Sequence, residues 1–181
     1  MRMDKDISKV LFNEVELHGA CKRLGEQITR DYEGKDLLVV GILNGAIVFC
    51  TDLMRQIDRQ INIDFMSVSS YGEGTVSSGK VKVMKDLNGS IKGRNVLIVD
   101  DILDTGKTML HLVDMQQQRD PASLKICVLL DKPARREEDI YADYVGYTIP
   151  DAFVVGYGLD YAEKYRNLPY IGVLDPSVYS K

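Results

Sequence analysis

The stretch VLIVDDILDTGKT, from Val96 to Thr108, decides the fold class of this chain. It starts as a continuous apolar run, which is typical of a parallel strand that is covered on both faces. The run ends in two adjacent acids, Asp100 and Asp101, and a third, Asp104, stands directly before TGKT. A buried strand that leads through polar residues into a helix is the repeating unit of an α/β fold.

Further apolar runs alternate with helix-like segments on both sides of this stretch. Strands are predicted over residues 36–43, 61–71, 80–87, 95–101 and 123–132, and helices over 13–30, 45–57 and 106–118, the first capped by Asn13. This alternation predicts a mainly parallel central sheet flanked by helices. Short strand-like pieces at 143–161 and 170–174, separated by proline and glycine, are expected to form a small lobe over the sheet.

Composition narrows the classes of protein that fit. With 181 residues, 45% of them hydrophobic, we expect one domain over 1–181. The net charge of -4 and the lack of a basic block argue against nucleic acid as a partner. Three widely spaced cysteines indicate free buried thiols in a reducing compartment, and no segment has the length or apolarity of a signal core or membrane span. We therefore expect a soluble cytoplasmic protein with no membrane contact.

The letters GKT suggest a nucleotide-binding P-loop, but the spacing does not fit. That motif requires a glycine five positions before Gly106, and this position holds Asp101. A carboxylate there would repel a phosphate that must approach backbone amides. The sequence therefore argues against a P-loop NTPase.

A division of the stretch into two halves fits its chemistry better. Thr105 to Thr108 open a helix, where backbone amides suit a phosphate monoester. Asp100 and Asp101 can accept hydrogen bonds from ribose hydroxyls or hold magnesium. A sugar phosphate would satisfy both halves, although aspartates at a strand end also serve as helix caps or turn residues.

These residues carry a resemblance to a known family. Val96 to Thr108 resembles the phosphoribosyl-pyrophosphate signature of the type I phosphoribosyltransferases. The segments ILNGA, SSYG, LLDKPARR, IPDAFVVGYGLDYAEKYRNLP and YIGVL are similar, in sequence and order, to the bacterial hypoxanthine-guanine phosphoribosyltransferases. The resemblance covers nearly the whole chain, and the combination of motifs is far more specific than the signature alone.

The resemblance implies a purine salvage enzyme with the type I phosphoribosyltransferase fold. Such an enzyme transfers the 5-phosphoribosyl group from phosphoribosyl pyrophosphate to N9 of hypoxanthine or guanine, giving IMP or GMP and pyrophosphate, with Mg²⁺. The family implies a hood built from the N-terminal and C-terminal segments, a mobile lid at about 69–80, and homodimers or homotetramers.

Residue roles follow from the same motifs. Asp104 would be the catalytic acid or base near purine N7. The resemblance assigns ribose and 5-phosphate binding to Asp100, Asp101, Thr105, Gly106, Lys107 and Thr108, pyrophosphate binding to Leu43, Asn44, Gly45 and Arg166, purine binding to Lys132, Phe153, Val154 and Asp160, the lid to Ser70 and Tyr71, and the metal to Asp100, Asp101 and Asp160.

Some positions discriminate among relatives. Similar adenine enzymes usually carry alanine where this chain has Asp104, and a lysine at 132 would reject the adenine amino group, so both favour 6-oxopurines. Asn44 stands where the family often has lysine, after a non-proline cis peptide, and Ala152 stands where some relatives have lysine. The alternative is a regulator that binds phosphoribosyl pyrophosphate without catalysis. It would be expected to lack a coherent base pocket and to carry a module or face for nucleic acid.

Overall fold

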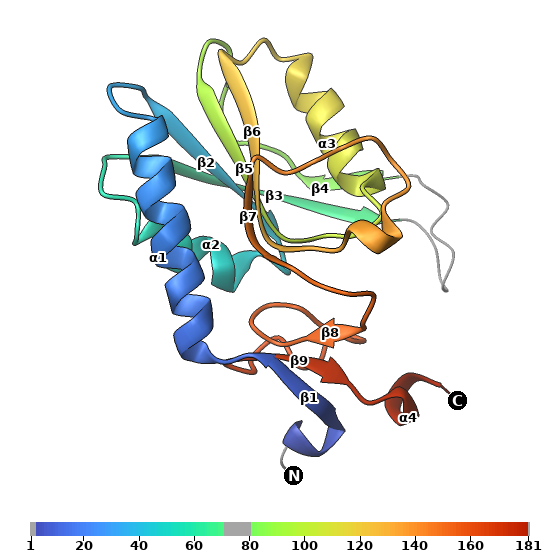
Figure 1. Ribbon diagram of the computed structural model, residues 1–181. Coiled ribbons are helices and arrows are strands. Elements are labelled where there is room, and N and C mark those ends of the chain that lie inside the picture. Colours follow the sequence, from blue (N-terminus) through green and yellow to red (C-terminus); the bar gives the residue numbers. More distant parts are fainter. Residues whose placement is uncertain (1–2, 71–80, 181) are drawn as a thin grey trace.

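The computed structural model of the chain describes residues 3–70 and 81–180, which form two sheets (Figure 1). The larger sheet has the order β4-β3-β2-β5-β6-β7 and the smaller sheet has the order β1-β9-β8. The strands are β1 Ile7–Phe12, β2 Leu37–Leu43, β3 Asn62–Ser70, β4 Val81–Lys85, β5 Asn95–Leu103, β6 Ser123–Asp131, β7 Tyr144–Thr148, β8 Val154–Val155 and β9 Ile171–Leu174. All neighbouring pairs in the large sheet are parallel except β3 with β4, which confirms the predicted α/β class.

Helices cover both faces of the large sheet. These are α1 Glu14–Asp31, α2 Ile47–Met54 and α3 Lys107–Gln117. The chain also has the short helix α4 Pro176–Tyr179 beside the small sheet and the 3-10 turns η1 Met3–Asp6 and η2 Pro133–Arg135 (Figure 1). α1 begins as predicted, because Asn13 and Glu16 form a reciprocal capping box. α1 and α2 lie on one face of the sheet and α3 on the other (Figure 1).

The apolar runs of β2 and β5 are continuous because these strands are buried on both sides. Val39 and Val99 pack under α1 and α2, whereas Val40 and Ile98 pack under α3. Successive side chains of a strand point to opposite faces, so each face needs its own apolar set. The two clusters fix the central strands, whose carboxyl ends carry the polar loops.

The small sheet forms a hood beyond one end of the large sheet (Figure 1). In it, β1 from the N-terminus pairs with β9, and β9 pairs with β8. No strand was predicted at β1. The expectation that the whole last third forms the small lobe was wrong for β7, which adds a parallel strand to the edge of the large sheet. The helix predicted over 45–57 is shorter at both ends, because the turn before it runs to Ala46 and the helix ends at Met54.

The three cysteines are free and buried, as predicted. Burial raises the pKa of Cys21 to about 11 and that of Cys50 to about 12. These thiols therefore stay protonated near neutral pH, and they are not nucleophiles.

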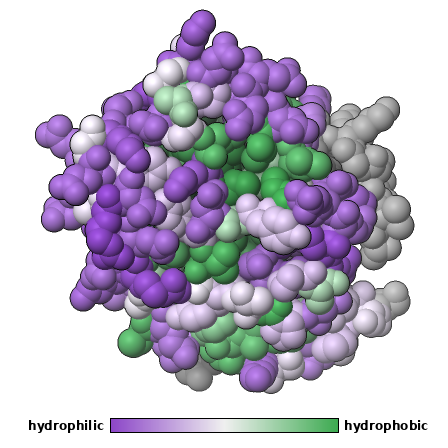
Figure 2. All heavy atoms as spheres, turned by 45° about the horizontal axis from the view of Figure 1, so that its top comes forward, coloured by the Kyte–Doolittle hydropathy of each residue, from purple (hydrophilic) through white to green (hydrophobic). Residues whose placement is uncertain are grey.

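The face in Figure 2 is mainly hydrophilic, with hydrophobic residues gathered in hollows near its centre. In the described part of the chain, every helix is too short or too polar to cross a membrane.

Candidate active site

The ends of several strands, the turn after β2 and the hood loop line an open cavity of about 560 Å³. In open α/β sheets, ligands bind beyond the carboxyl ends of the strands, so this is the expected place for a site. The cavity is lined by Ile42, Leu43, Asn44, Gly45, Ser67, Val68, Ser69, Met84, Asp100, Asp101, Asp160, Glu163 and Arg166. Seven of the residues predicted for the metal and pyrophosphate therefore line one cavity.

Two glycines allow the turn after β2 to touch both an acid and the hood. A Cβ added at Gly45 would lie 1.9 Å from Asp101 Oδ2, and one at Gly158 would lie 2.1 Å from the Gly45 carbonyl oxygen. Gly158 also has φ +104°, a conformation that favours glycine. The peptide between Leu43 and Asn44 is cis, as the family resemblance implies. Backbone, carboxylate and hood loop thus meet without an intervening side chain.

Asp100 and Asp101 lie within β5, near its carboxyl end, rather than after it. Burial and the charge of Asp101 raise the pKa of Asp100 well above its usual range. Burial also raises the pKa of Asp101, opposed by its hydrogen bond with Asp100 and by the charge of Arg166. Two carboxylates that repel each other beside a cavity favour a bound cation.

The acids of this cavity suit a magnesium ion that is bound together with a phosphorylated ligand. Among residues 3–70 and 81–180, no three acidic, histidine or cysteine side chains form a ready-made metal cage. Asp100, Asp101 and Asp160 nevertheless line the same cavity. Mg²⁺ is usually bound by one or two carboxylates together with water and substrate phosphates, so this donor set fits the ion when a phosphorylated ligand is present.

Arg166 projects from the hood loop beside these acids. Its Nη2 lies 2.9 Å from Asp160 Oδ1, and its Nη1 donates to the Gly158 carbonyl at 2.9 Å. Glu163 also pairs with the guanidinium. The Nε atom is buried and bonds to no described residue. The loop therefore orients the guanidinium of Arg166, and its Nε–H remains able to donate a hydrogen bond.

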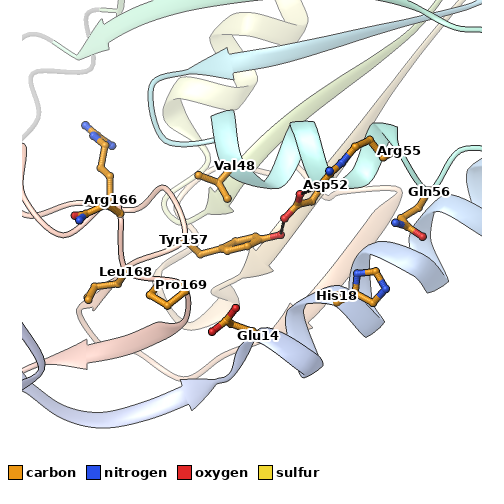
Figure 3. A pocket seen from close by; sticks show the side chains of 11 residues that line it. Glu14, His18, Val48, Asp52, Arg55, Gln56, Tyr157, Arg166, Leu168 and Pro169 are labelled. Carbon is orange, nitrogen blue, oxygen red and sulfur yellow. Dashed lines mark hydrogen bonds and ion pairs between the residues drawn. The ribbon is translucent and has the colours of Figure 1, made fainter.

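A second cavity lies behind the turn after β2, between α1, α2 and the hood (Figure 3). There Tyr157 donates a hydrogen bond to Asp52 of α2, while Arg166 extends away from both of them. The bond ties the hood loop to α2, the helix that follows the turn. The hydrogen bond between Tyr157 and Asp52 thus helps to hold α2, and the turn that precedes it, in place.

Residues 105–108, for which phosphate binding was predicted, lead from β5 into the first turn of α3. Gly106 precedes α3 with φ +90°, and an added Cβ would lie 2.7 Å from Ile140 Cγ2. The first turn of α3 contains no acid, so its amides suit an anion. The ammonium of Lys107, however, forms an ion pair with Glu137. The side chain of Lys107 is therefore engaged by Glu137, whereas its backbone lies at the start of α3.

Asp104 and Lys132 meet across neighbouring loops. Lys132 Nζ lies 3.7 Å from Asp104 Oδ2 and also 3.7 Å from Asp151 Oδ1, and only 5% of this lysine is exposed. Asp104 Oδ1 is 3.5 Å from Arg135 Nε, yet it is buried and accepts no hydrogen bond from the residues described. An unsatisfied carboxylate oxygen can accept a proton or hydrogen bond from a ligand.

The hood contains an aromatic residue, Phe153, that is close in sequence to Asp151 of this charged cluster. Phe153 follows Asp151 by two residues and is 41% exposed, which is high for a phenylalanine. Val154 is buried in β8. Ser70 ends β3, whereas Tyr71 and the rest of the predicted lid lie outside the residues that the structure describes.

Sequence reasoning missed three residues of the Asp104 environment, Arg135, Arg136 and Asp151. Arg136 Nε donates to the Asp104 carbonyl at 2.9 Å, and its Nη2 donates to the Leu103 carbonyl at 3.2 Å. It also pairs with Asp131 at the end of β6. The motif DKPARR contained the signal, because two arginines after a strand end lie where the ligand crevice is expected.

A family model described as phosphoribosyl transferase domain matches residues 12–162. The chain is 54% identical to the hypoxanthine-guanine phosphoribosyltransferase of Bacillus subtilis, over 98% of each protein. It is 56% identical, over 99% of its length, to the bifunctional protein TilS/HprT of Listeria monocytogenes, but it spans only 28% of that protein.

Solved structures agree in fold. A crystal structure of a hypoxanthine phosphoribosyltransferase from Staphylococcus aureus superposes with a TM-score of 0.95 at 54% identity, covering 99% of this chain and 97% of the other. A hypoxanthine-guanine phosphoribosyltransferase from Bacillus anthracis gives a TM-score of 0.88 at 49% identity, over 93% and 99% of the two chains.

Proposed function

The chain belongs to the phosphoribosyl transferase domain family, and from this premise we propose that it is a purine salvage enzyme. It transfers the 5-phosphoribosyl group from phosphoribosyl pyrophosphate to N9 of hypoxanthine, and of guanine, giving IMP or GMP and pyrophosphate. One observation carries the proposal. The unsatisfied carboxylate of Asp104 stands between a phosphate loop and the buried cation of Lys132.

The sugar phosphate takes the first half of the site. Its 5-phosphate binds the backbone amides and hydroxyls of residues 105–108, where the amino end of α3 favours an anion. Its ribose hydroxyls donate to Asp100 and Asp101. Pyrophosphate occupies the turn at Leu43 to Gly45 and the guanidinium of Arg166, whose buried Nε has a donor to give.

The base takes the second half. Lys132 donates to the exocyclic O6, which an adenine lacks, and a buried polar group left without its partner costs binding energy. Asp104 exchanges a proton with the base near N7 as N9 becomes nucleophilic. Phe153 offers a ring for stacking, and the backbone of Val154 reads the edge of the base.

Mg²⁺, held by the acids of the cavity and the substrate phosphates, would supply charge neutralisation for the departing pyrophosphate. Asp100, Asp101 and Asp160 are the donors that the cavity provides. The chain itself contributes positioning of the two substrates. Bringing N9 to the anomeric carbon in a fixed orientation converts a bimolecular step into a unimolecular one.

The proposal extends to organisation and place. Residues 1–181 form one catalytic domain, with a lid at about 69–80 that includes Ser70 and Tyr71 and excludes water from the reacting sugar. The enzyme acts in the cytoplasm, where the buried free thiols remain reduced, and it assembles as a homodimer or homotetramer. It uses no nucleic acid and no membrane.

A regulator that binds phosphoribosyl pyrophosphate without catalysis is the alternative. The proposed purine-binding part of the site argues against a regulator. There Asp104, Lys132 and Asp151 form a charged cluster that a regulator would not require. A spectrophotometric assay separates the two functions. Hypoxanthine, guanine, xanthine and adenine are each incubated with phosphoribosyl pyrophosphate and Mg²⁺. Turnover of hypoxanthine, with little or none of adenine, is expected, whereas binding without turnover of any oxopurine would support the regulator.

A further inference from the structure

Three aromatic rings of the hood meet in a cluster that consists of Phe153, Tyr161 and Tyr179. Phe153 stacks on Tyr179, with ring centroids 5.1 Å apart and planes 28° apart. Tyr161 meets Phe153 edge-on at 5.7 Å and 86°, and Tyr179 at 6.2 Å and 61°. Offset stacks and edge-to-face pairs are favourable arrangements of aromatic rings. Only Phe153 of the three has a role in the proposed function.

Phe153 keeps one face open. A ring has two faces, and Tyr179 covers one of them. The centroid of Tyr161 is only 6.2 Å from that of Tyr179, so Tyr161 does not lie over the opposite face of Phe153. Phe153 nevertheless remains 41% exposed. This exposure is what a ring with one covered and one uncovered face would show. The uncovered face is available to a flat ligand.

Tyr179 is fixed in place although it lies near the C-terminus. Its helix α4 is capped by Asp175, whose side chain accepts from the Ser177 amide at 2.9 Å. The amide of Asp175 donates to the Asp6 carbonyl at 2.8 Å, which ties α4 to the N-terminal segment. Val178 packs against a buried group of hood residues, Val155, Tyr165, Leu168 and Leu174, and α4 follows β9 directly (Figure 1).

Phe153 is tied to the same strand. Its carbonyl accepts from the Leu174 amide at 2.9 Å, at the end of β9 from which α4 leaves. The two stacked rings are therefore held by one short piece of backbone. A ring that is already oriented loses less conformational freedom when a ligand binds to it.

We propose that Tyr179 is a positioning residue for the incoming base. It stacks on one face of Phe153 and fixes that ring so that the opposite face receives the purine, while Tyr179 itself does not touch the base. The inference rests on the proposed function. It makes the C-terminal helix part of the purine site. It also predicts that loss of the Tyr179 ring weakens binding of the purine base but not binding of phosphoribosyl pyrophosphate.

The test compares Tyr179→Leu, which removes the ring, with Tyr179→Phe, which keeps it. KM for hypoxanthine is measured at saturating phosphoribosyl pyrophosphate, and KM for phosphoribosyl pyrophosphate at saturating hypoxanthine. Stacked aromatic pairs contribute enough to predict that Tyr179→Leu raises KM for hypoxanthine about 2- to 12-fold. Tyr179→Phe should restore the wild-type value, and KM for phosphoribosyl pyrophosphate should not change in either variant.

Two controls guard the interpretation. Tyr141→Leu removes a tyrosine that is 73% exposed and lies outside the cluster, and it should change neither KM. Tyr179→Leu added to Phe153→Leu should cause no further rise, because Tyr179 acts only through Phe153. Sedimentation velocity and thermal unfolding of every variant test for altered assembly or folding.

Several outcomes would overturn the inference. An unchanged KM for hypoxanthine in Tyr179→Leu would remove Tyr179 from the site, and a lower one would mean that Tyr179 occupies the place of the purine. An equal rise in both KM values, or a Tyr179→Phe variant as impaired as Tyr179→Leu, would indicate a structural role alone. A wild-type protein without turnover would instead refute the proposed function.

Discussion

Replacement of Asp104 by asparagine removes the proposed acid or base while it leaves the rest of the site in place. Asparagine has nearly the same shape, and the bond from Arg136 reaches the backbone carbonyl of Asp104 rather than its side chain. Lys132 keeps a second carboxylate, that of Asp151, at 3.7 Å. The phosphate loop and the acid pair of β5 are untouched. The change therefore isolates the proton-transfer step.

Its magnitude follows from the chemistry. General acid-base catalysis usually contributes about 10²- to 10⁴-fold, which corresponds to about 2.7–5.4 kcal/mol in the barrier. We expect kcat for hypoxanthine to fall by that factor in Asp104→Asn. The dissociation constant of phosphoribosyl pyrophosphate should stay within about threefold of wild type, since that ligand is bound by other residues.

The assay combines initial rates of IMP formation, followed by absorbance, with isothermal titration of phosphoribosyl pyrophosphate and Mg²⁺. Asp114→Asn, an exposed aspartate of α3, is the matched control and should behave as wild type. Unchanged turnover in Asp104→Asn would refute the reasoning. A loss of phosphoribosyl pyrophosphate binding as large as the loss of turnover would refute it as well.

Three further predictions concern other parts of the site. Lys132→Ala should raise KM for hypoxanthine and guanine at least about tenfold, because O6 loses its donor, with little change in titrated phosphoribosyl pyrophosphate affinity; equal losses would point to misfolding. Gly45→Ala should weaken that affinity, since its Cβ would lie 1.9 Å from Asp101 Oδ2, and calorimetry showing normal affinity would contradict this. Burial and Asp101 raise the pKa of Asp100, so its charged form destabilises the metal-free fold as pH rises above about 4. Asp100→Asn should therefore raise Tm in the absence of Mg²⁺ at pH 7.5 by about 2–4 °C, which is the shift for about 1 kcal/mol in a domain of this size. In thermal scans near pH 4 this gain in Tm should vanish. An equal gain at both pH values would exclude the charge of Asp100 as its cause.

The elements that the sequence predicted correctly are those whose signal is local. The strands at β2 and β5 are continuous apolar runs because both their faces are buried, and α1 begins at a capping box. β1 gave no such signal, because its middle residues Ser8 to Val10 are exposed and its partner β9 lies at the other end of the chain. β7 was assigned to the wrong sheet because strand character does not specify a pairing partner.

The site divides in the same way. Contiguous motifs predicted roles for Asp104, for the pair Asp100 and Asp101, and for residues 105–108. The structure places Asp100 and Asp101 in one cavity with the turn at Gly45. Contacts across the chain were not visible in the sequence. The clamp of Arg136 on the Asp104 loop and the pairing of Asp151 with Lys132 depend on how β5, β6 and the hood come together. The stacking of Tyr179 on Phe153 is of the same kind.

The central claim is that the acids and the phosphate loop serve different parts of one pair of substrates. A crystal structure with phosphoribosyl pyrophosphate, Mg²⁺ and 9-deazahypoxanthine, which lacks the reactive N9, tests it most directly. The 5-phosphate should lie on residues 105–108, the ribose hydroxyls on Asp100 and Asp101, and the base between Asp104, Lys132 and Phe153. A phosphate bound away from the start of α3, or a base out of reach of Asp104, would contradict the account.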